Sequence, residues 1–505
     1  MGKLLINYLV FSFVFASFSV GQIPGNQLFD NSKIHEIKIV SLYEDLSDTL
    51  ISNYMLSFGM NQFQIRDIPY APALLMIDGT ALDTLGIRYK GFNSWWHSVK
   101  KPIKIDLNRY KTDQEFDGLK KFNLHNGSGD PSFIRENIDY KILRSLGIKA
   151  PRTAFAQVYM DTSYMGLYRI VEQVDNVFLD VNFGNHKGNL YVQEAIGTAG
   201  FSLRWEGSSQ EAYYESIKLE NHQTANDWSG FIHFLDVLNN SSERDFRDLI
   251  LTVFDVEEYL QILAFDIAVN NLDFYGNSGR NFYLYEHNGI FHWIPWDYNL
   301  SWKEGEVPVN IDPGDYPVLI RRILQVPEFH DLFMRKYCVL KSYFADTYVD
   351  NLVTGEASAI STYMQDDPYP DYPYEAFQKN RDSAWSRIPG LKPFAAKRFA
   401  DISKTLEDLH VNCSNSAEIT APDQYLLELY PVPASEWLNI GRFPDEEVRV
   451  AIFDSYGQLV INATLFEKGK INVSHLTPGC YVVKAVVGKM VCSRLLFVYH
   501  GPGCK

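Results

Sequence analysis

The sequence predicts an α+β protein with a small all-β domain near its C-terminal end. Strand-like segments fill the first third, helical periodicity dominates the middle, and short strands return after residue 424. The 505 residues are 46% hydrophobic and 14% aromatic, enough for two or more folded domains. We expect a leader at 1–21, a main domain at 34–410, a linker at 411–424, and an immunoglobulin-like sandwich at 425–500.

The charge of the chain excludes some partners. The formal net charge is -16 at pH 7, and no long run of lysine and arginine offsets it. Bulk attraction to nucleic acid or to an anionic membrane is therefore not expected.

Residues 1–21 have the features of a secretory signal peptide. Lys3 supplies a basic start, an apolar stretch follows from Leu4 to Phe18, and Ser19 and Gly21 are small. A membrane anchor is the weaker alternative, because the stretch is short for a bilayer. No later segment approaches the roughly 20 apolar residues of a spanning helix, so we expect no transmembrane segment in the mature chain.

Short strands separated by turn signals fill residues 34–111 and predict a mostly antiparallel sheet. A helix is expected next, with Asp130 as its N-cap and Pro131 at its first position. An apolar stripe from Ile134 to Leu146 supports this helix. The strands that we expect before and after it are Ile37–Leu42, Ala73–Ile77, Leu85–Lys90, Pro102–Leu107, Ala154–Met160 and Gly166–Val171.

The middle of the chain predicts further helices. One begins at Asp255, which forms a capping box with Glu258, and residues 327–340 and 393–409 have helical periodicity. The proline-rich segment 366–374 predicts an ordered surface loop, with a lid over a cleft as the less favoured alternative.

The cysteines do not indicate a metal site, because they show no CxxC pair and no histidine at ligand spacing. They are Cys338, Cys413, Cys480, Cys492 and Cys504. In an oxidising compartment, Cys480 and Cys492 are the pair that we expect to bond across neighbouring strands.

The most informative pattern is a hairpin within residues 270–302 that has an acidic residue at each end. Asn288-Gly289 favours a two-residue type I′ turn between two segments rich in aromatic and β-branched residues. Centred on this turn, Asn281 faces Trp296. The residues gathered at the open end are Asp273, Arg280, Asn281 and Asp297.

Two carboxylates and an asparagine at this spacing suit phosphoryl transfer, which depends on positioning and charge neutralisation. Asp273 can orient or deprotonate an attacking hydroxyl, while Asn281 and Asp297 offer the oxygen ligands that Mg²⁺ prefers. The structural alternative is that Asp273 caps a turn and Asp297 pairs with Arg280.

Five segments occur in an order that resembles one known family. They are RYKGFNSWW at 88–96, KKPIKIDLN at 100–108, DPSFIRENIDYKILRSLGIKAPR at 130–152, GLYRIVEQVDNVFL at 166–179, and NFYLY with IPWDYN at 281–299. Together they resemble the CotH family of kinase-like proteins. The resemblance implies an atypical protein-kinase-like fold, with a small β-rich lobe, a larger helical lobe, and ATP with Mg²⁺ or Mn²⁺ between them.

The resemblance also implies roles at the hairpin. Asp273 resembles the catalytic-loop aspartate, and Asp297 stands where kinases keep a metal-binding aspartate. Asn281 is the expected second metal ligand, with Asn277 as a competing candidate.

In the small lobe, the family implies a lysine that binds the α and β phosphates. Lys104 resembles this residue, and Lys90 is the second choice. Glu136 is the expected partner of that lysine, with a solvated surface glutamate as the alternative. Glu172 is expected near the adenine or the metal, with a structural salt bridge as the alternative.

The C-terminal strands carry a second set of motifs. They are YPVP at 430–433, WLNI at 437–440, IFDSYG at 452–457 and LTPGCY at 476–481. They resemble the C-terminal sorting domain of type IX secretion substrates. This resemblance implies that the type IX secretion machinery carries the chain from the periplasm through the outer membrane, to be secreted or attached to the cell surface.

We therefore expect a kinase that transfers the γ-phosphoryl group of ATP to Ser or Thr residues of surface or coat proteins. One alternative is a catalytically inactive kinase-fold surface protein for adhesion or assembly. Another is a two-carboxylate glycan hydrolase, which requires carboxyl groups roughly 5 to 9.5 Å apart and no lysine facing them.

Overall fold

The computed structural model describes residues 23–42, 45–57, 68–193, 200–305 and 308–413. It also describes residues 428–498, apart from gaps at 431–433, 442–446, 454–457, 467–468 and 488–489. The expected leader and most of the expected linker lie outside the described residues. Two large hydrophobic clusters lie before residue 414, and residues 153–160 and 163–172 contribute to both. A small cluster lies after residue 433.

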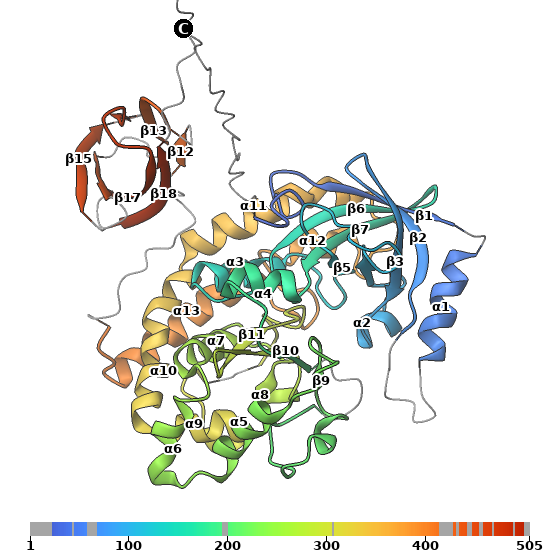
Figure 1. Cartoon of the computed structure of the whole chain (residues 1–505), viewed down its shortest axis with the longest axis horizontal. Helices are drawn as coiled ribbons and strands as arrows, with labels where there is room; N and C mark the ends of the chain where they lie inside the picture. Colours follow the sequence, from blue (N-terminus) through green and yellow to red (C-terminus); the bar gives the residue numbers. More distant parts are fainter. Residues whose placement is uncertain are drawn as a thin grey trace, which may run out of the picture.

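A closed seven-stranded barrel forms the N-terminal part (Figure 1), in the order β1-β2-β3-β4-β5-β7-β6. Neighbouring strands are antiparallel except β1 and β6, which are parallel. The strands are β1 (His35–Ser41), β2 (Ala71–Ile77), β3 (Thr80–Tyr89), β4 (Ile103–Asp106), β5 (Lys121–His125), β6 (Thr153–Met160) and β7 (Ser163–Glu172), with short helices α1 (Leu46–Leu56) and α2 (Asn93–Trp96) beside them. The strands predicted from the sequence are confirmed.

The alternation of side chains along these strands separates the barrel core from its outer face. Ile87, Ile105 and Phe122 form one row across β3, β4 and β5, and all three are fully buried in the barrel core. The neighbouring row, on the outer face, is Arg88, Lys104 and Asn123. The polar positions of these strands therefore share the face that lies outside the barrel.

Helix α3 (Arg135–Ser145) connects β5 to β6 and begins one turn later than predicted. Phe133 has a φ of +58°, so the chain cannot be helical from Pro131. The Asp130 carboxylate still accepts a hydrogen bond from the backbone N–H of Arg135 at 2.9 Å, as a cap across this turn.

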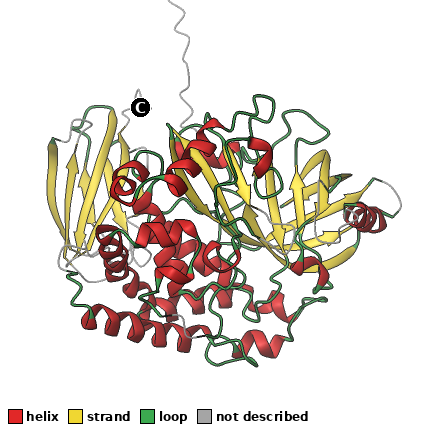
Figure 2. Cartoon of the chain, turned by 90° about the horizontal axis from the view of Figure 1, so that it is seen from below, coloured by secondary structure: helices red, strands yellow, loops and turns green. Residues whose placement is uncertain are grey.

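The second hydrophobic cluster holds a four-stranded sheet, in the order β11-β10-β8-β9, among helices. Figure 2 shows these helices as a group beside the strands of the barrel. The strands are β8 (Leu190–Gln193), β9 (Lys218–Leu219), β10 (Phe282–His287) and β11 (Ile290–Pro295). The helices are α4 (Asn176–Phe183), α5 (Ser229–Asn240), α6 (Glu243–Ile250), α7 (Val256–Ala268), α8 (Tyr275–Ser278), α9 (Val318–Leu324), α10 (Pro327–Leu340), α11 (Asp346–Gln365), α12 (Tyr374–Lys379) and α13 (Leu391–Asp408).

Three sequence predictions for this part are confirmed. The Asp255 carboxylate caps α7 by accepting a hydrogen bond from the backbone N–H of Glu258 at 3.0 Å. Helix α10 has the predicted bounds, and α13 begins two residues before the predicted start.

The proline-rich segment between α11 and α12 is mostly exposed, as predicted, but Tyr372 is partly buried and Asp367 is buried. The Asp367 carboxylate is buried, lies 2.6 Å from Nζ of Lys100, and accepts a hydrogen bond from the backbone N–H of Leu167 at 3.0 Å. The helical part is thereby joined to the barrel through a buried ion pair.

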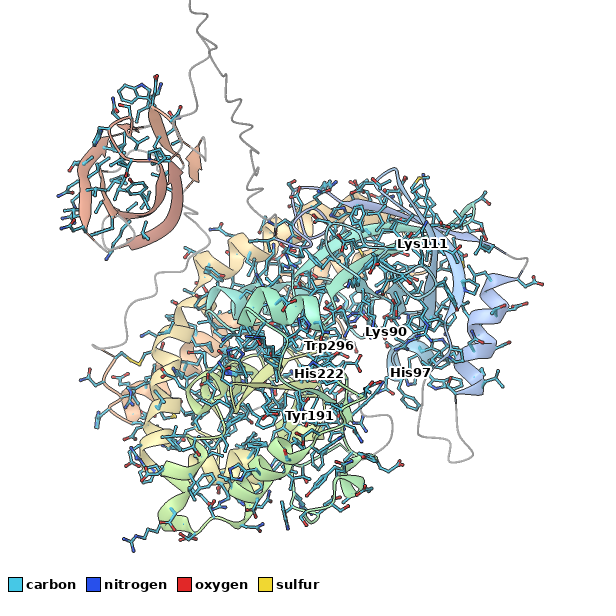
Figure 3. All side chains as sticks on the ribbon, in the orientation of Figure 1. Lys90, His97, Lys111, Tyr191, His222 and Trp296 are labelled. Carbon is cyan, nitrogen blue, oxygen red and sulfur yellow. A yellow bond between two sulfur atoms is a disulfide. The ribbon has the colours of Figure 1, made fainter. Side chains whose placement is uncertain are left out.

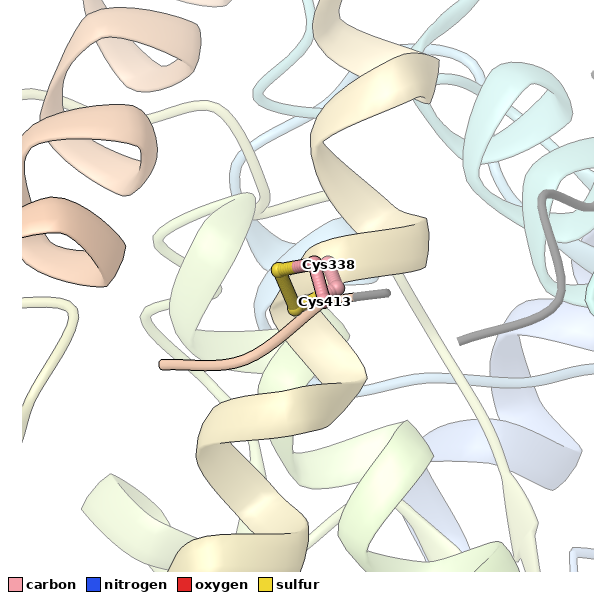
Figure 4. Close-up of a disulfide and its surroundings, with 2 residues drawn as sticks. All are labelled: Cys338 and Cys413. Atoms are coloured by element: carbon pink, nitrogen blue, oxygen red, sulfur yellow. A yellow bond between two sulfur atoms is a disulfide. The ribbon is translucent and has the colours of Figure 1, made fainter. Parts of the chain in front are cut away.

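A disulfide joins Cys338 on α10 to Cys413 just after α13 (Figure 4). The predicted Cys480–Cys492 pair is wrong. In the strand register Cys480 faces Phe497, whereas Cys492 faces Ala485, five residues further along β17. A disulfide requires Cα atoms no more than about 7 Å apart, and five residues of strand span about 16 Å.

The C-terminal part contains two sheets around the small hydrophobic cluster. One sheet has the order β12-β13-β16 and the other β15-β14-β17-β18. The strands are β12 (Glu428–Tyr430), β13 (Trp437–Gly441), β14 (Glu447–Phe453), β15 (Leu459–Phe466), β16 (Gly469–Asn472), β17 (Gly479–Val487) and β18 (Met490–Val498). The prediction of an all-β region is confirmed.

Candidate active site

The hairpin of β10 and β11 has the predicted register. Leu284 pairs with Trp293, and beyond the last ladder pair the backbone N–H of Trp296 donates to the carbonyl oxygen of Asn281 at 3.3 Å. At the turn, Asn288 and Gly289 both have positive φ, +54° and +81°, as a type I′ turn requires. The two chain segments that flank the hairpin are therefore brought to the same open end.

At this open end the backbone leaves the regular strand conformation. Asn281 has a φ of +63° and Asp297 a φ of +58°. Left-handed conformations of non-glycine residues are uncommon and occur preferentially at functional sites. The directions of these two side chains are therefore set by the local backbone and not by strand alternation.

Asn281 is hydrogen-bonded to Asp273. Its side-chain nitrogen donates to the backbone carbonyl oxygen of Asp273 at 2.8 Å and to the Asp273 carboxylate at 3.0 Å. A backbone carbonyl oxygen can only accept a hydrogen bond, so the NH₂ end of the amide must face Asp273 and the Oδ1 end must face elsewhere. Asn277, the competing candidate, is exposed and donates instead to the carbonyl oxygen of Asn271 at 3.2 Å.

Asp297 lies in an electrostatic field made mainly by other carboxylates. Burial, together with the negative charges of Glu136 and Asp273, raises the pKa of Asp297 to about 7, while Lys90 opposes the shift. The structure therefore brings the predicted residues Asp273, Asp297, Glu136 and Lys90 into one electrostatically coupled group.

Lys90 follows β3 and contacts two residues to which the sequence assigned no functional role. Its Nζ lies 3.1 Å from Nε2 of His125 and 5.0 Å from the centre of the Trp296 ring. Figure 3 labels Lys90 and Trp296, which lie together between the barrel strands and the helical part. The His125 ring also meets Trp296 edge to face, with centroids 5.9 Å apart.

Glu136 is fully buried on α3, so the alternative of a solvated surface glutamate is wrong. Its carboxylate lies 3.0 Å from Nδ1 of His125 and 2.7 Å from Nη1 of Arg169. Burial alone would raise the pKa of Glu136, but His125 and Arg169 lower it to about 2. The glutamate is therefore ionised and reaches Lys90 through a histidine.

Lys104, the first-choice lysine, lies on the outer face of β4, in the row of Arg88 and Asn123. It is 6% exposed, and its side chain makes no hydrogen bond or ion pair with any residue that the structure describes. The side chain is therefore largely buried, while its ammonium is available to a ligand or to solvent.

Glu172, at the end of β7, does not join this group. Its carboxylate accepts hydrogen bonds from the backbone N–H and Nε of Arg152, both at 3.0 Å. It is 1% exposed. Glu172 therefore forms a structural salt bridge with Arg152, which was the alternative considered from the sequence.

Helix α3 also holds the segment that follows the hairpin. The backbone N–H of Asp297 donates to the Tyr140 hydroxyl at 2.9 Å, and Nε1 of Trp302 donates to the buried Asp139 carboxylate at 2.7 Å. Ser301 donates to the same carboxylate. Helix α3 therefore fixes both Glu136 and the backbone of Asp297.

A second group of acidic and histidine side chains lies at the start of α7. Ligand atoms of Asp255, Glu258 and His292 lie within 4.8 Å of one another. The Asp255 carboxylate is engaged as a helix cap, and Lys149 forms an ion pair with Glu258. A lysine ammonium already balances this group, which makes it a weaker place for a metal ion than the open end of the hairpin.

Comparisons with known proteins agree with this architecture. The CotH kinase protein family matches residues 87–400, and the secretion system C-terminal sorting domain matches residues 428–498. The inner spore coat protein H of Bacillus subtilis (strain 168) is 26% identical over 332 residues, which cover 63% of this chain and 88% of that protein.

Among solved structures, the Shewanella oneidensis MR-1 toxin–antitoxin complex of HipA, HipB and operator DNA contains a chain that is 13% identical. That match covers 61% of this chain and 63% of that chain with a TM-score of 0.26, too low to support any argument. In the described part of the chain, no helix has the length and hydropathy needed to cross a bilayer. The chain belongs to the CotH kinase protein family and ends in a sorting domain for type IX secretion to the cell surface or outside.

Proposed function

We propose that the chain is a secreted or surface-attached kinase that transfers the γ-phosphoryl group of ATP to Ser or Thr residues of a surface or coat protein. The observation that carries this proposal is the Asp273–Asn281 hydrogen bond beside Asp297 and Lys90. These residues place an acceptor for a hydroxyl proton, oxygen ligands for a metal and a cation for phosphate close together.

In this proposal, the barrel with its own core is the small lobe and the helical part is the large lobe. The catalytic domain spans residues 34–410, although the family match begins at residue 87. Strand β1 pairs with both β2 and β6, so the residues before the match complete the barrel. The C-terminal sheets form an immunoglobulin-like sandwich that serves in sorting.

Two lysines suit the phosphates of ATP. Lys90 is tied to His125 and Trp296, whereas Lys104 has no partner among the described residues and occupies the same outer face. A flexible ammonium can follow phosphate oxygens as the charge on them changes. We assign both lysines to phosphate binding, with Lys90 nearer to Asp297 because it contributes to the pKa of that residue.

The residues present also fit a divalent metal. Asn281 has its Oδ1 end turned away from Asp273, and Asp297 has a pKa raised by burial and by neighbouring negative charge, so a cation there would favour its ionised form. Asn281 and Asp297 would hold Mg²⁺ or Mn²⁺. When bound, the metal neutralises charge on the phosphate oxygens.

Asp273 acts on the acceptor hydroxyl. Its backbone N–H donates to Oδ1 of Asn271 at 3.1 Å, and Asn281 holds its carboxylate. The carboxylate orients the Ser or Thr hydroxyl and accepts its proton as the oxygen attacks phosphorus. The glycan hydrolase alternative is disfavoured, because Lys90 lies within the electrostatic reach of these carboxylates.

Nucleotide binding by the purified chain tests this proposal. We expect ATP to bind in the presence of Mn²⁺ and to bind much more weakly without it. Asp297→Asn should abolish the metal dependence, whereas Asp255→Asn, in the second acidic group, should leave it unchanged. Absence of metal-dependent ATP binding in the unaltered chain would end the kinase proposal and leave the inactive surface protein as the alternative.

A further inference from the structure

A histidine connects the lysine and the glutamate of the proposed site. Nζ of Lys90 lies 3.1 Å from Nε2 of His125, and Nδ1 of His125 lies 3.0 Å from the Glu136 carboxylate. His125 is the last residue of β5, the strand that leads to α3, and Lys90 reaches it from β3 across one strand. The three side chains form a continuous connection from α3 to the outer face of the barrel.

The chemistry of the two outer groups decides the state of His125. A carboxylate only accepts hydrogen bonds, so Nδ1 must carry the proton that faces Glu136. An ammonium only donates, so Nε2 must be the unprotonated acceptor for Lys90. Neutral histidine in its Nδ1–H tautomer satisfies both groups. Burial lowers the pKa of His125, in agreement with this neutral state.

Arg169 completes the connection. Its Nη1 lies 2.7 Å from the Glu136 carboxylate, its Nη2 donates to the carbonyl oxygen of Phe133 at 2.6 Å, and the guanidinium is fully buried. The charge of Glu136 is therefore balanced by Arg169, and neutral His125 adds none. The ammonium of Lys90 contacts the histidine, and the histidine contacts the glutamate.

We propose that His125 is a positioning residue that directs the Lys90 ammonium to the polyphosphate of a nucleoside triphosphate. The hydrogen bond from Lys90 to His125 fixes the lysine without a direct lysine–glutamate ion pair. This inference rests on the proposed function for its ligand, but the state of His125 follows from the geometry alone.

Two substitutions separate hydrogen bonding from ring packing. His125→Phe keeps an aromatic ring beside Trp296 and removes both hydrogen bonds. His125→Gln keeps an acceptor for Lys90 and a donor for Glu136. Titration calorimetry of the full chain with ATP and Mn²⁺, and separately with adenosine, gives the readout, because adenosine lacks the phosphates.

We expect His125→Phe to weaken ATP binding by about tenfold or more, the scale of a lost charge-assisted hydrogen bond. Adenosine binding should stay unchanged, and His125→Gln should restore most of the ATP affinity. The matched control is Glu172→Gln, which removes a buried ion pair with Arg152 outside the proposed site. It should lower the melting temperature and leave both affinities unchanged.

Unchanged ATP affinity in His125→Phe would overturn the inference. Parallel losses of ATP and adenosine affinity would assign His125 a structural role and overturn it as well, as would failure of His125→Gln to restore affinity. If the unaltered chain binds no ATP, the proposed function fails. Nitrogen-15 NMR of the imidazole in the unliganded chain tests the positioning of Lys90 by His125 separately: a neutral Nδ1–H ring supports that positioning, and an imidazolium or an Nε2–H ring contradicts it.

Discussion

The side-chain amide of Asn281 donates hydrogen bonds to both the carboxylate and the backbone carbonyl oxygen of Asp273, at 3.0 and 2.8 Å. In the proposed site one residue thus holds the proton acceptor with its nitrogen and meets the metal with its oxygen. The two functions are joined by the rigid amide plane. A change at Asn281 is therefore expected to affect both.

Asn281→Asp should impair phosphoryl transfer while keeping an oxygen ligand for the metal. Two carboxylates at hydrogen-bond distance repel each other, which raises the pKa of at least one and displaces Asp273. We expect kcat to fall by about a hundredfold, the scale of a lost general base. Steady-state kinetics check this, with Asn277→Asp as the matched control; equal activity of Asn281→Asp and the unaltered chain would contradict the role of Asn281.

Lys104→Met should weaken ATP binding and stabilise the fold. The lysine is 6% exposed and has no partner among the described residues, so an apolar side chain of similar length should raise stability by about 1 kcal/mol. ATP affinity should fall by about tenfold with the loss of the charge. Lys111→Met, at an exposed surface position, is the control, and thermal melting with calorimetry gives both quantities. A less stable variant with full ATP affinity would contradict both expectations.

Asp266→Asn should remove a pH-dependent loss of stability. Burial raises the pKa of Asp266 to about 7, against the effect of hydrogen bonds from Tyr298 and Asn271. Because the folded-state pKa lies above the unfolded value, the carboxyl destabilises the fold progressively as the pH rises from about 4 to 7.

The variant should therefore melt at a higher temperature than the unaltered chain at pH 8, with the difference shrinking toward pH 4. The expected gain at pH 8 is roughly 2 to 4 kcal/mol. Melting curves at several pH values measure it. A difference that does not change with pH would show that Asp266 has an ordinary pKa in the folded chain.

Removal of the disulfide should destabilise the helical part. Cys338 and Cys413 are separated by 75 positions, and closing a loop of that length contributes about 4 kcal/mol in the chain-entropy model. The double variant Cys338→Ala, Cys413→Ala should have a lower melting temperature than the unaltered chain. Reductant should lower the melting temperature of the unaltered chain and leave that of the double variant unchanged. Equal melting temperatures with and without reductant would indicate that the bond contributes little.

Local patterns predicted the elements well, and tertiary packing decided the site. The Asn288-Gly289 turn fixed the hairpin register, because only φ-positive residues suit that turn. Glu136 lies off the apolar stripe of its own helix, so the periodicity could not distinguish a functional residue from a solvated surface glutamate. The outer face of the barrel buries it through Arg169 and His125, a contact between elements that no local pattern encodes.

The missed residues have a common cause. His125 ends a strand, and Trp296 and Tyr140 have the character of core residues, so nothing in their spacing distinguished them from packing. The wrong disulfide followed from knowing that two strands are neighbours without knowing their register. The preference for Lys104 over Lys90 also depended on which strand end approaches Asp297, which only the folded chain determines.

The most direct measurement is γ-phosphoryl transfer by Asp273→Asn compared with the unaltered chain, using radiolabelled ATP with Mn²⁺ and with dephosphorylated casein and the chain itself as acceptors. We predict phosphorylation of Ser or Thr by the unaltered chain. The variant should bind ATP equally well and transfer phosphate at least about a thousandfold more slowly. Transfer that persists in Asp273→Asn, or its absence from an unaltered chain that binds ATP with Mn²⁺, would contradict the account.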